Sequence, residues 1–230
     1  MFRSRRRDLV FPQAEHARLA AAIAQAWGNE RWQRPPVPFG AFVQAAALHD
    51  RGYGQLDTHG IGEVSAERWL EIQRASFAPR DADPVVDLLV ALHVRRLVAS
   101  RWSAAPPLAL REFDAQLPAL RRAAGIATSD GAEADRVMDL CDAIAFDFCL
   151  ELPARGRVDV VPTRAAPAVA VEYSLDGEGL IGLDPWPLGV TRLDGFVLGF
   201  EASGYPERPT PVVTAFRVLP HAEAAPSPTA

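Results

Sequence analysis

Apolar residues recur at helical spacing through the first two-thirds of the chain. Such spacing is typical of the buried face of an amphipathic helix, whereas prolines and glycines interrupt it. Prolines at positions 35, 36 and 38 form one interruption, and a glycine-rich stretch over 51–66 is predicted to be a loop. The pattern predicts helices from Gln13 to about Trp27, Phe39 to about Asp50, Asp83 through Leu97, Pro106 to about Ala124 and Asp130 to about Leu150.

The pattern changes after Pro153, where short β-rich runs alternate with Gly, Pro and Asp clusters. Strands are expected over 158–161, 168–173, 195–201 and 212–218, with a hairpin turn over 177–182. The polar tail over 221–230 is expected to be disordered. We therefore predict a mainly α protein, with a helical domain over 1–154 and a small C-terminal antiparallel β element over 155–220 packed on it.

Composition narrows the function classes. The 230 residues carry a formal net charge of −5, and all 24 basic residues are arginine. A protein without lysine has no Schiff-base lysine, P-loop or kinase-type ATP site. The acidic balance makes nucleic acid an unexpected partner, despite basic residues at 3, 5, 6 and 7. No apolar run approaches the ~18 residues of a membrane helix, and no signal-peptide core follows the basic start, so a cytoplasmic protein is expected.

Histidines and aspartates in apolar surroundings form the candidate chemistry. They are His16, the doublet His49-Asp50, His93 and Asp142, and each falls in or at the end of a predicted helix. A buried carboxylate costs several kcal/mol unless it is paired or bound to a metal. Imidazole and carboxylate together suit Mn, Fe, Co or Zn, so the helices are predicted to hold one or two divalent transition-metal ions.

The motifs around these residues resemble the HD-domain metal-dependent phosphohydrolases, and within them an uncharacterised bacterial family without an assigned activity. The segments that carry the resemblance are Gln13-Ala-Glu-His16, Leu48-His49-Asp50-Arg51-Gly52-Tyr53, Leu89-Val-Ala-Leu-His93 and Leu140-Cys-Asp142. The resemblance implies an HD-like helical bundle. It implies that His16, His49, Asp50 and Asp142 ligate a first metal, and that His93 ligates a second metal or contacts a phosphate. It also implies that Asp50 orients an attacking water.

One position departs from this resemblance. Many HD hydrolases have a lysine after the glycine of the doublet motif, whereas Tyr53 stands here. Arginine is therefore expected to neutralise phosphate, with Arg96 as a catalytic candidate and Arg51 and Arg95 as substrate-binding candidates. His59 and Asp57 follow the doublet in the glycine-rich loop, and they are further substrate-binding candidates.

Three functions are compatible with these residues. The first is a metal-dependent hydrolase that acts on a nucleotide or another small phosphate ester by metal-activated water. The second is an HD-type di-iron oxygenase, and the third is a binding module that keeps the HD fold without catalysis. The β element either covers the site or forms the contact of a homodimer, and the residues leave both options open.

Overall fold

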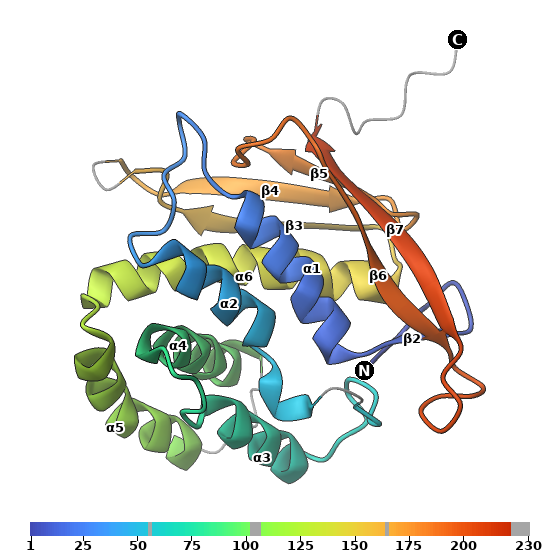
Figure 1. Cartoon of the computed structure of the whole chain (residues 1–230), viewed down its shortest axis with the longest axis horizontal. Helices are drawn as coiled ribbons and strands as arrows, with labels where there is room; N and C mark the ends of the chain where they lie inside the picture. The colour runs from blue at the N-terminus through green and yellow to red at the C-terminus, as the bar shows by residue number, and fades with distance from the viewer. Residues whose placement is uncertain (55–56, 102–106, 164–165, 222–230) are drawn as a thin grey trace.

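The computed structural model describes residues 1–54, 57–101, 107–163 and 166–221 (Figure 1). Within these ranges the chain forms six α-helices and a curled mixed sheet of seven strands. The protein is 46% helical, and 21% of it is strand. The prediction of a mainly α bundle with a small antiparallel β element is therefore wrong. Of the predicted disordered tail, all but His221 lies outside the described residues.

The helices pack side by side beneath the sheet (Figure 1). Five of them lie where the periodicity predicts helices, and the sequence analysis missed α3. Ser65 begins this helix, because its hydroxyl accepts a hydrogen bond of 3.2 Å from the Arg68 N–H. The helices are α1 (Gln13–Ala26), α2 (Phe39–Leu48), α3 (Ala66–Phe77), α4 (Pro84–Arg101), α5 (Pro107–Ala124) and α6 (Thr128–Leu150), with a short 3₁₀ turn η1 (Arg51–Tyr53).

The sheet is larger than predicted because it recruits both ends of the chain. Its strands are β1 (Phe2–Arg3), β2 (Leu9–Phe11), β3 (Ala154–Val160), β4 (Val169–Leu175), β5 (Leu180–Asp184), β6 (Leu193–Glu201) and β7 (Pro211–Pro220). They are ordered β1-β2-β6-β7-β5-β4-β3. Strand β2 pairs antiparallel with β6, and β5 pairs parallel with β7 with Ile181 opposite Val218. The predicted hairpin turn over 177–182 is thus only partly a turn, because β5 begins at Leu180.

The sheet covers helices α1 and α6, and these two helices separate it from α2 and α4 (Figure 1). Aromatic side chains fill the space between sheet and helices, as where Phe148 of α6 meets Phe216 of β7 edge-on with ring centroids 6.1 Å apart. Helix α1 is also hydrogen-bonded to the sheet, because Glu15 accepts from the Leu198 N–H at 2.7 Å. No described helix combines the length and apolar composition that a membrane span requires.

Candidate metal centre

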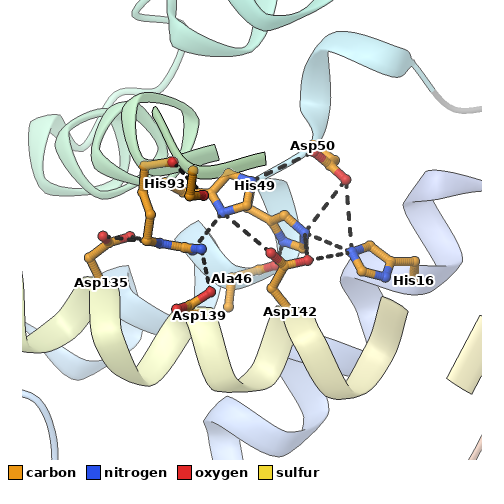
Figure 2. A network of polar contacts seen from close by, with 10 residues as sticks. His16, Ala46, His49, Asp50, His93, Asp135, Asp139 and Asp142 are labelled. Atoms are coloured by element: carbon orange, nitrogen blue, oxygen red, sulfur yellow. Dashed lines mark hydrogen bonds and ion pairs between the residues drawn. The ribbon is translucent and has the colours of Figure 1, made fainter. Parts of the chain in front are cut away.

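Four helical segments bring three histidines and two aspartates to one buried point (Figure 2). The five residues are His16 on α1, His49 at the end of α2 with Asp50 directly after it, His93 on α4 and Asp142 on α6. The imidazoles of His16, His49 and His93 are each at most 1% exposed, and the two carboxylates at most 10%. The residues that the sequence predicts as metal ligands therefore share one site.

The ring and carboxylate atoms of this cluster lie at the separations of ligands around a single ion. His16 Nε2 is 2.9 Å from His49 Nε2 and 3.1 Å from Asp142 Oδ1. His49 Nε2 is 3.5 Å from Asp142 Oδ1 and 3.6 Å from Asp50 Oδ2. Two ligands about 2.1 Å from a metal are about 3.0 Å apart at a right angle and about 3.4 Å apart at a tetrahedral angle. The two Nε2 atoms and Asp142 Oδ1 are thus arranged to share a cation, and Asp50 Oδ2 lies beside them, 3.8 Å from His16 Nε2.

Neighbouring groups decide which nitrogen of each ring faces the cluster. His49 Nδ1 lies 2.7 Å from the Ala46 carbonyl, so it donates its proton there and leaves the Nε2 lone pair for a metal. In His93 the hydrogen bond runs the other way. Arg96 Nη2 lies 3.0 Å from His93 Nδ1, and a guanidinium can only donate. The ring proton of His93 therefore sits on Nε2, 3.8 Å from Asp50 Oδ1.

The positions of the charges favour ionised carboxylates. Burial alone would raise the pKa of Asp142, but hydrogen bonds with His16 and His49 hold it well below its usual range. Burial likewise opposes ionisation of Asp50, and the charge on His49 reverses the effect, so this pKa is lowered too. The two carboxylates outweigh the burial of His49 and raise its pKa to about 9. Burial lowers the pKa of His93 instead, so this ring is neutral at pH 7.

Some buried polar atoms of the cluster have no hydrogen-bond partner among the described residues. They include Asp142 Oδ2, which can bind an ion, and the protonated His93 Nε2, which can donate to a bound ligand. Buried polar atoms are normally satisfied, so such orphans are expected where a bound ion or ligand supplies the partner. The donor set of imidazole and carboxylate is also the one that Mn, Fe, Co and Zn accept. The residues present therefore fit a bound transition metal.

A cavity of about 190 Å³ opens onto this cluster. Asp50, His93 and Asp142 form part of its wall. Three other polar or aromatic side chains come from the same segments, because Gln13 lies three residues before His16, Tyr53 three after Asp50 and Phe146 four after Asp142. The rest of the lining is Phe2, Gly60, Ile61, Gly62, Val64, Trp69 and Leu97. Small molecules can therefore reach the cluster from one side.

Comparison with known proteins places the chain in a family. Residues 2–198 match the family model described as "Protein of unknown function (DUF3891)". The chain belongs to the DUF3891 family. The matched segment contains every residue of the cluster and of the cavity wall. No curated protein and no solved structure matches the chain.

The two arginines predicted to bind substrate are not among the residues of the cavity wall and form contacts of their own. Arg51 forms an ion pair of 2.8 Å with Asp87 and donates to the carbonyls of Ser76 and Ala78. Arg95 is half-buried on α4, where it pairs with Asp114 at 2.9 Å. Both guanidiniums are therefore occupied within the fold.

Three further predicted residues also have partners. Arg96 pairs with Asp135 and Asp139 besides its bond to His93. Asp57 is buried, where it accepts from the Gln13 N–H at 3.1 Å and pairs with the amino group of Met1. His59 is exposed, with Nδ1 3.1 Å from the Thr58 hydroxyl. Of these, only Arg96 touches the cluster.

Sequence reasoning did not single out most of the cavity wall. Gln13 and Tyr53 were visible only as parts of the motifs around His16 and the doublet. The spacing of three or four residues from a ligand was the available signal, because such positions share a helix face. Phe2 and Trp69 come from a short strand and an unpredicted helix, so no local pattern connects them with the cluster.

Proposed function

We propose that this chain is a metal-dependent hydrolase of the HD type that acts on a phosphate ester. Two overlapping sets of possible ligands beside an open cavity carry this proposal: His16, His49 and Asp142 form one set, and His49, Asp50 and His93 form the other. His16, His49, Asp50 and Asp142 would hold the ion. When bound, the metal would lower the pKa of a coordinated water towards neutrality and polarise a phosphoryl oxygen.

The chain's own residues would then perform three tasks. Asp50, whose carboxylate lies in the cavity wall, would accept a hydrogen bond from the attacking water and orient it. His93 would donate its Nε2 proton in a hydrogen bond to a phosphate oxygen, because Arg96 keeps Nδ1 occupied. Arg96 therefore acts as a positioning residue. The apolar walls would exclude bulk water around the reacting group.

The cluster favours one metal over two. The two groups of atoms close enough to share an ion both contain His49 Nε2, which can bind only one. A second ion would be left with Asp50 and His93 from the described cluster, and the Nε2 of His93 is protonated. Di-iron carboxylate sites in helical bundles use about six protein ligands. Among the described residues, the cluster therefore supports a mononuclear hydrolase better than a di-iron oxygenase.

Elemental analysis of protein purified without chelator tests the proposal. We expect near-stoichiometric Mn, Fe, Co or Zn in the wild type and its loss in Asp50→Asn and Asp142→Asn. Asp147→Asn is the matched control, because Asp147 lies on α6 like Asp142 but accepts a bond of 2.7 Å from the Tyr173 hydroxyl. The metal-loaded wild type should release phosphate from simple phosphate esters.

Two results would contradict this proposal. If the protein stays metal-free after soaking in Mn, the proposed metal site is wrong. If the metal-loaded protein hydrolyses no phosphate ester, the proposed reaction is wrong. Two irons per chain would favour the oxygenase instead.

A further inference from the structure

The wall of the cavity beside the cluster is mostly apolar. Its polar side chains are Asp50, His93 and Asp142 of the cluster together with Gln13 and Tyr53. Its other side chains are aromatic and aliphatic, from Phe2, Ile61, Val64, Trp69, Leu97 and Phe146. A ligand in this space can therefore present one polar head to the cluster, while its remaining surface meets hydrocarbon.

No cationic side chain occurs in the described cavity wall. The protein contains no lysine, and the nearby arginines 51 and 96 are held by carboxylates within the fold. Arginine and lysine are the usual partners of additional phosphate and carboxylate groups. A ligand with more than one anionic group would therefore leave the others in the cavity without a counter-charge.

The size and the hydrogen-bonding capacity of the cavity are small as well. Its 190 Å³ lies below the roughly 300–1,000 Å³ of pockets that hold drug-sized ligands. Besides the cluster, the wall contains one buried orphan acceptor, Gln13 Oε1, on a side chain that is 3% exposed. A purine base with its ribose needs several polar partners, whereas this wall offers few.

We infer that the substrate of the proposed hydrolase is a small phosphate monoester whose organic group is apolar or aromatic, with at most one further polar group. This inference rests on the proposed function. In the reaction, the water oxygen forms a bond to phosphorus as the bond between phosphorus and the ester oxygen breaks. One water proton passes to the leaving oxygen, which yields an alcohol and inorganic phosphate.

Binding of non-hydrolysable phosphonates to the metal-loaded protein tests the inference without catalysis. Benzylphosphonate and methylphosphonate share a head group and differ in the phenyl ring. Burial of that ring predicts that benzylphosphonate binds on the order of tenfold to a hundredfold more tightly in calorimetry. Adenosine 5′-phosphate should bind more weakly than benzylphosphonate, because its base and ribose would face hydrocarbon.

Substitutions locate this preference in the cavity. Ile61 is 38% exposed in a loop, so Ile61→Ser should fold and should reduce the preference for benzylphosphonate about threefold or more. Val190→Ser is the matched control, because Val190 is similarly exposed at 42% and lies outside this cavity. The control should keep the preference of the wild type.

A parallel assay separates this inference from the proposed function. Benzyl phosphate, glycerol 3-phosphate and adenosine 5′-phosphate are all esters of primary alcohols, so their leaving groups are comparable. Failure to release phosphate from all three would overturn the hydrolase, even if benzylphosphonate binds. Equal binding of the two phosphonates, no binding of benzylphosphonate, or tighter binding of adenosine 5′-phosphate would overturn the inferred substrate class.

Discussion

At the scale of single residues, the cluster in the metal-free protein is stabilised by opposite charges that a metal would replace. Protonated His49 lies beside the ionised Asp50 and Asp142. Metal ligands must be deprotonated, so an ion that binds here has to displace the proton of His49. Asp50 and Asp142 would thus stabilise the charge of His49 in the metal-free protein and the charge of the ion in the metal-bound protein.

The raised pKa of His49 predicts how the stability of the metal-free protein depends on pH. The pKa is about 9 in the folded state and 6.5 as its ordinary value, so folding is favoured by the bound proton. This contribution, on the order of 3 kcal/mol, is complete below pH 6.5 and is lost as the pH rises through 9. Urea denaturation of chelator-treated protein between pH 6 and 9.5 should show this decline.

Two variants assign the effect to its residue. His49→Gln should flatten the decline, because the titrating ring is gone. His59→Ala should keep it, since His59 is exposed and its ring contacts the Thr58 hydroxyl. An equally stable wild type at pH 6 and pH 9 would contradict the assigned charges.

The arginines near the cluster show what sequence alone could and could not establish at this scale. The ligand residues were predictable, because charged and imidazole side chains in apolar helices need a common explanation. The carboxylates that pair with Arg51, Arg95 and Arg96 lie 19 to 43 residues away in sequence, although Arg96 also contacts His93 three residues before it. No local pattern reveals such partners, so three similar arginines turned out to have different surroundings.

At the scale of elements, the doublet is positioned by a helix that the sequence analysis missed. Turn η1 packs against α3, and the Gly52 N–H donates to the Ser76 hydroxyl at 2.9 Å. Helix α3 begins within a region whose glycines predict a loop, so its amphipathic face went unnoticed. Gly52 of the doublet motif is therefore explained by the close approach of the η1 backbone to the α3 backbone.

This approach predicts different outcomes for two glycine substitutions. A β-carbon on Gly52 would overlap the Ile72 carbonyl and lie 2.8 Å from the Ser76 backbone nitrogen. Gly52→Ala should therefore cost about 1–3 kcal/mol of unfolding free energy and, through the displaced Asp50, lower the metal content. Denaturation and elemental analysis measure the two effects.

Gly40→Ala provides the control for this prediction. Gly40 lies in α2, and no atom would come within 4 Å of its new β-carbon. Alanine is the better helix former, so this variant should be neutral or up to about 1 kcal/mol more stable, with full metal content. Equal behaviour of the two variants would show that the contact between η1 and α3 does not position the doublet.

At the scale of the whole molecule, five of the six described helices and the strands β3, β4, β6 and β7 lie where the sequence predicts them, whereas the full extent of the sheet was not predictable. A period of 3.6 repeats several times in a helix, whereas β1 and β2 have only two and three residues and show no period. The pairing of β2 with β6 joins residues about 190 positions apart in sequence. The sheet therefore extends across both ends of the chain, and an appendage confined to the C-terminal third does not describe it.

This arrangement predicts that the helices do not fold without the sheet. A chain that ends at residue 154 would lose β6, which pairs with β2 and is hydrogen-bonded to α1. It would also lose β7, whose Phe216 packs against Phe148. It would also leave the half-buried carboxylate of Glu15 without the Leu198 N–H. We expect this chain to show no cooperative thermal transition by circular dichroism and no stoichiometric metal.

A chain that ends at residue 221 is the control, because it keeps every described strand. It should unfold at the temperature of the full-length protein and bind the same amount of metal. A cooperative transition in the shorter chain, with one metal bound, would mean that the helical region over 1–154 is a domain of its own. In that case the contacts of α1 and α6 with the sheet would add stability without determining the metal centre. If only the longer chain unfolds cooperatively and binds metal, the sheet helps to hold His16 and Asp142 in place. The reason is that the sheet packs on α1 and α6, the two helices that carry these residues.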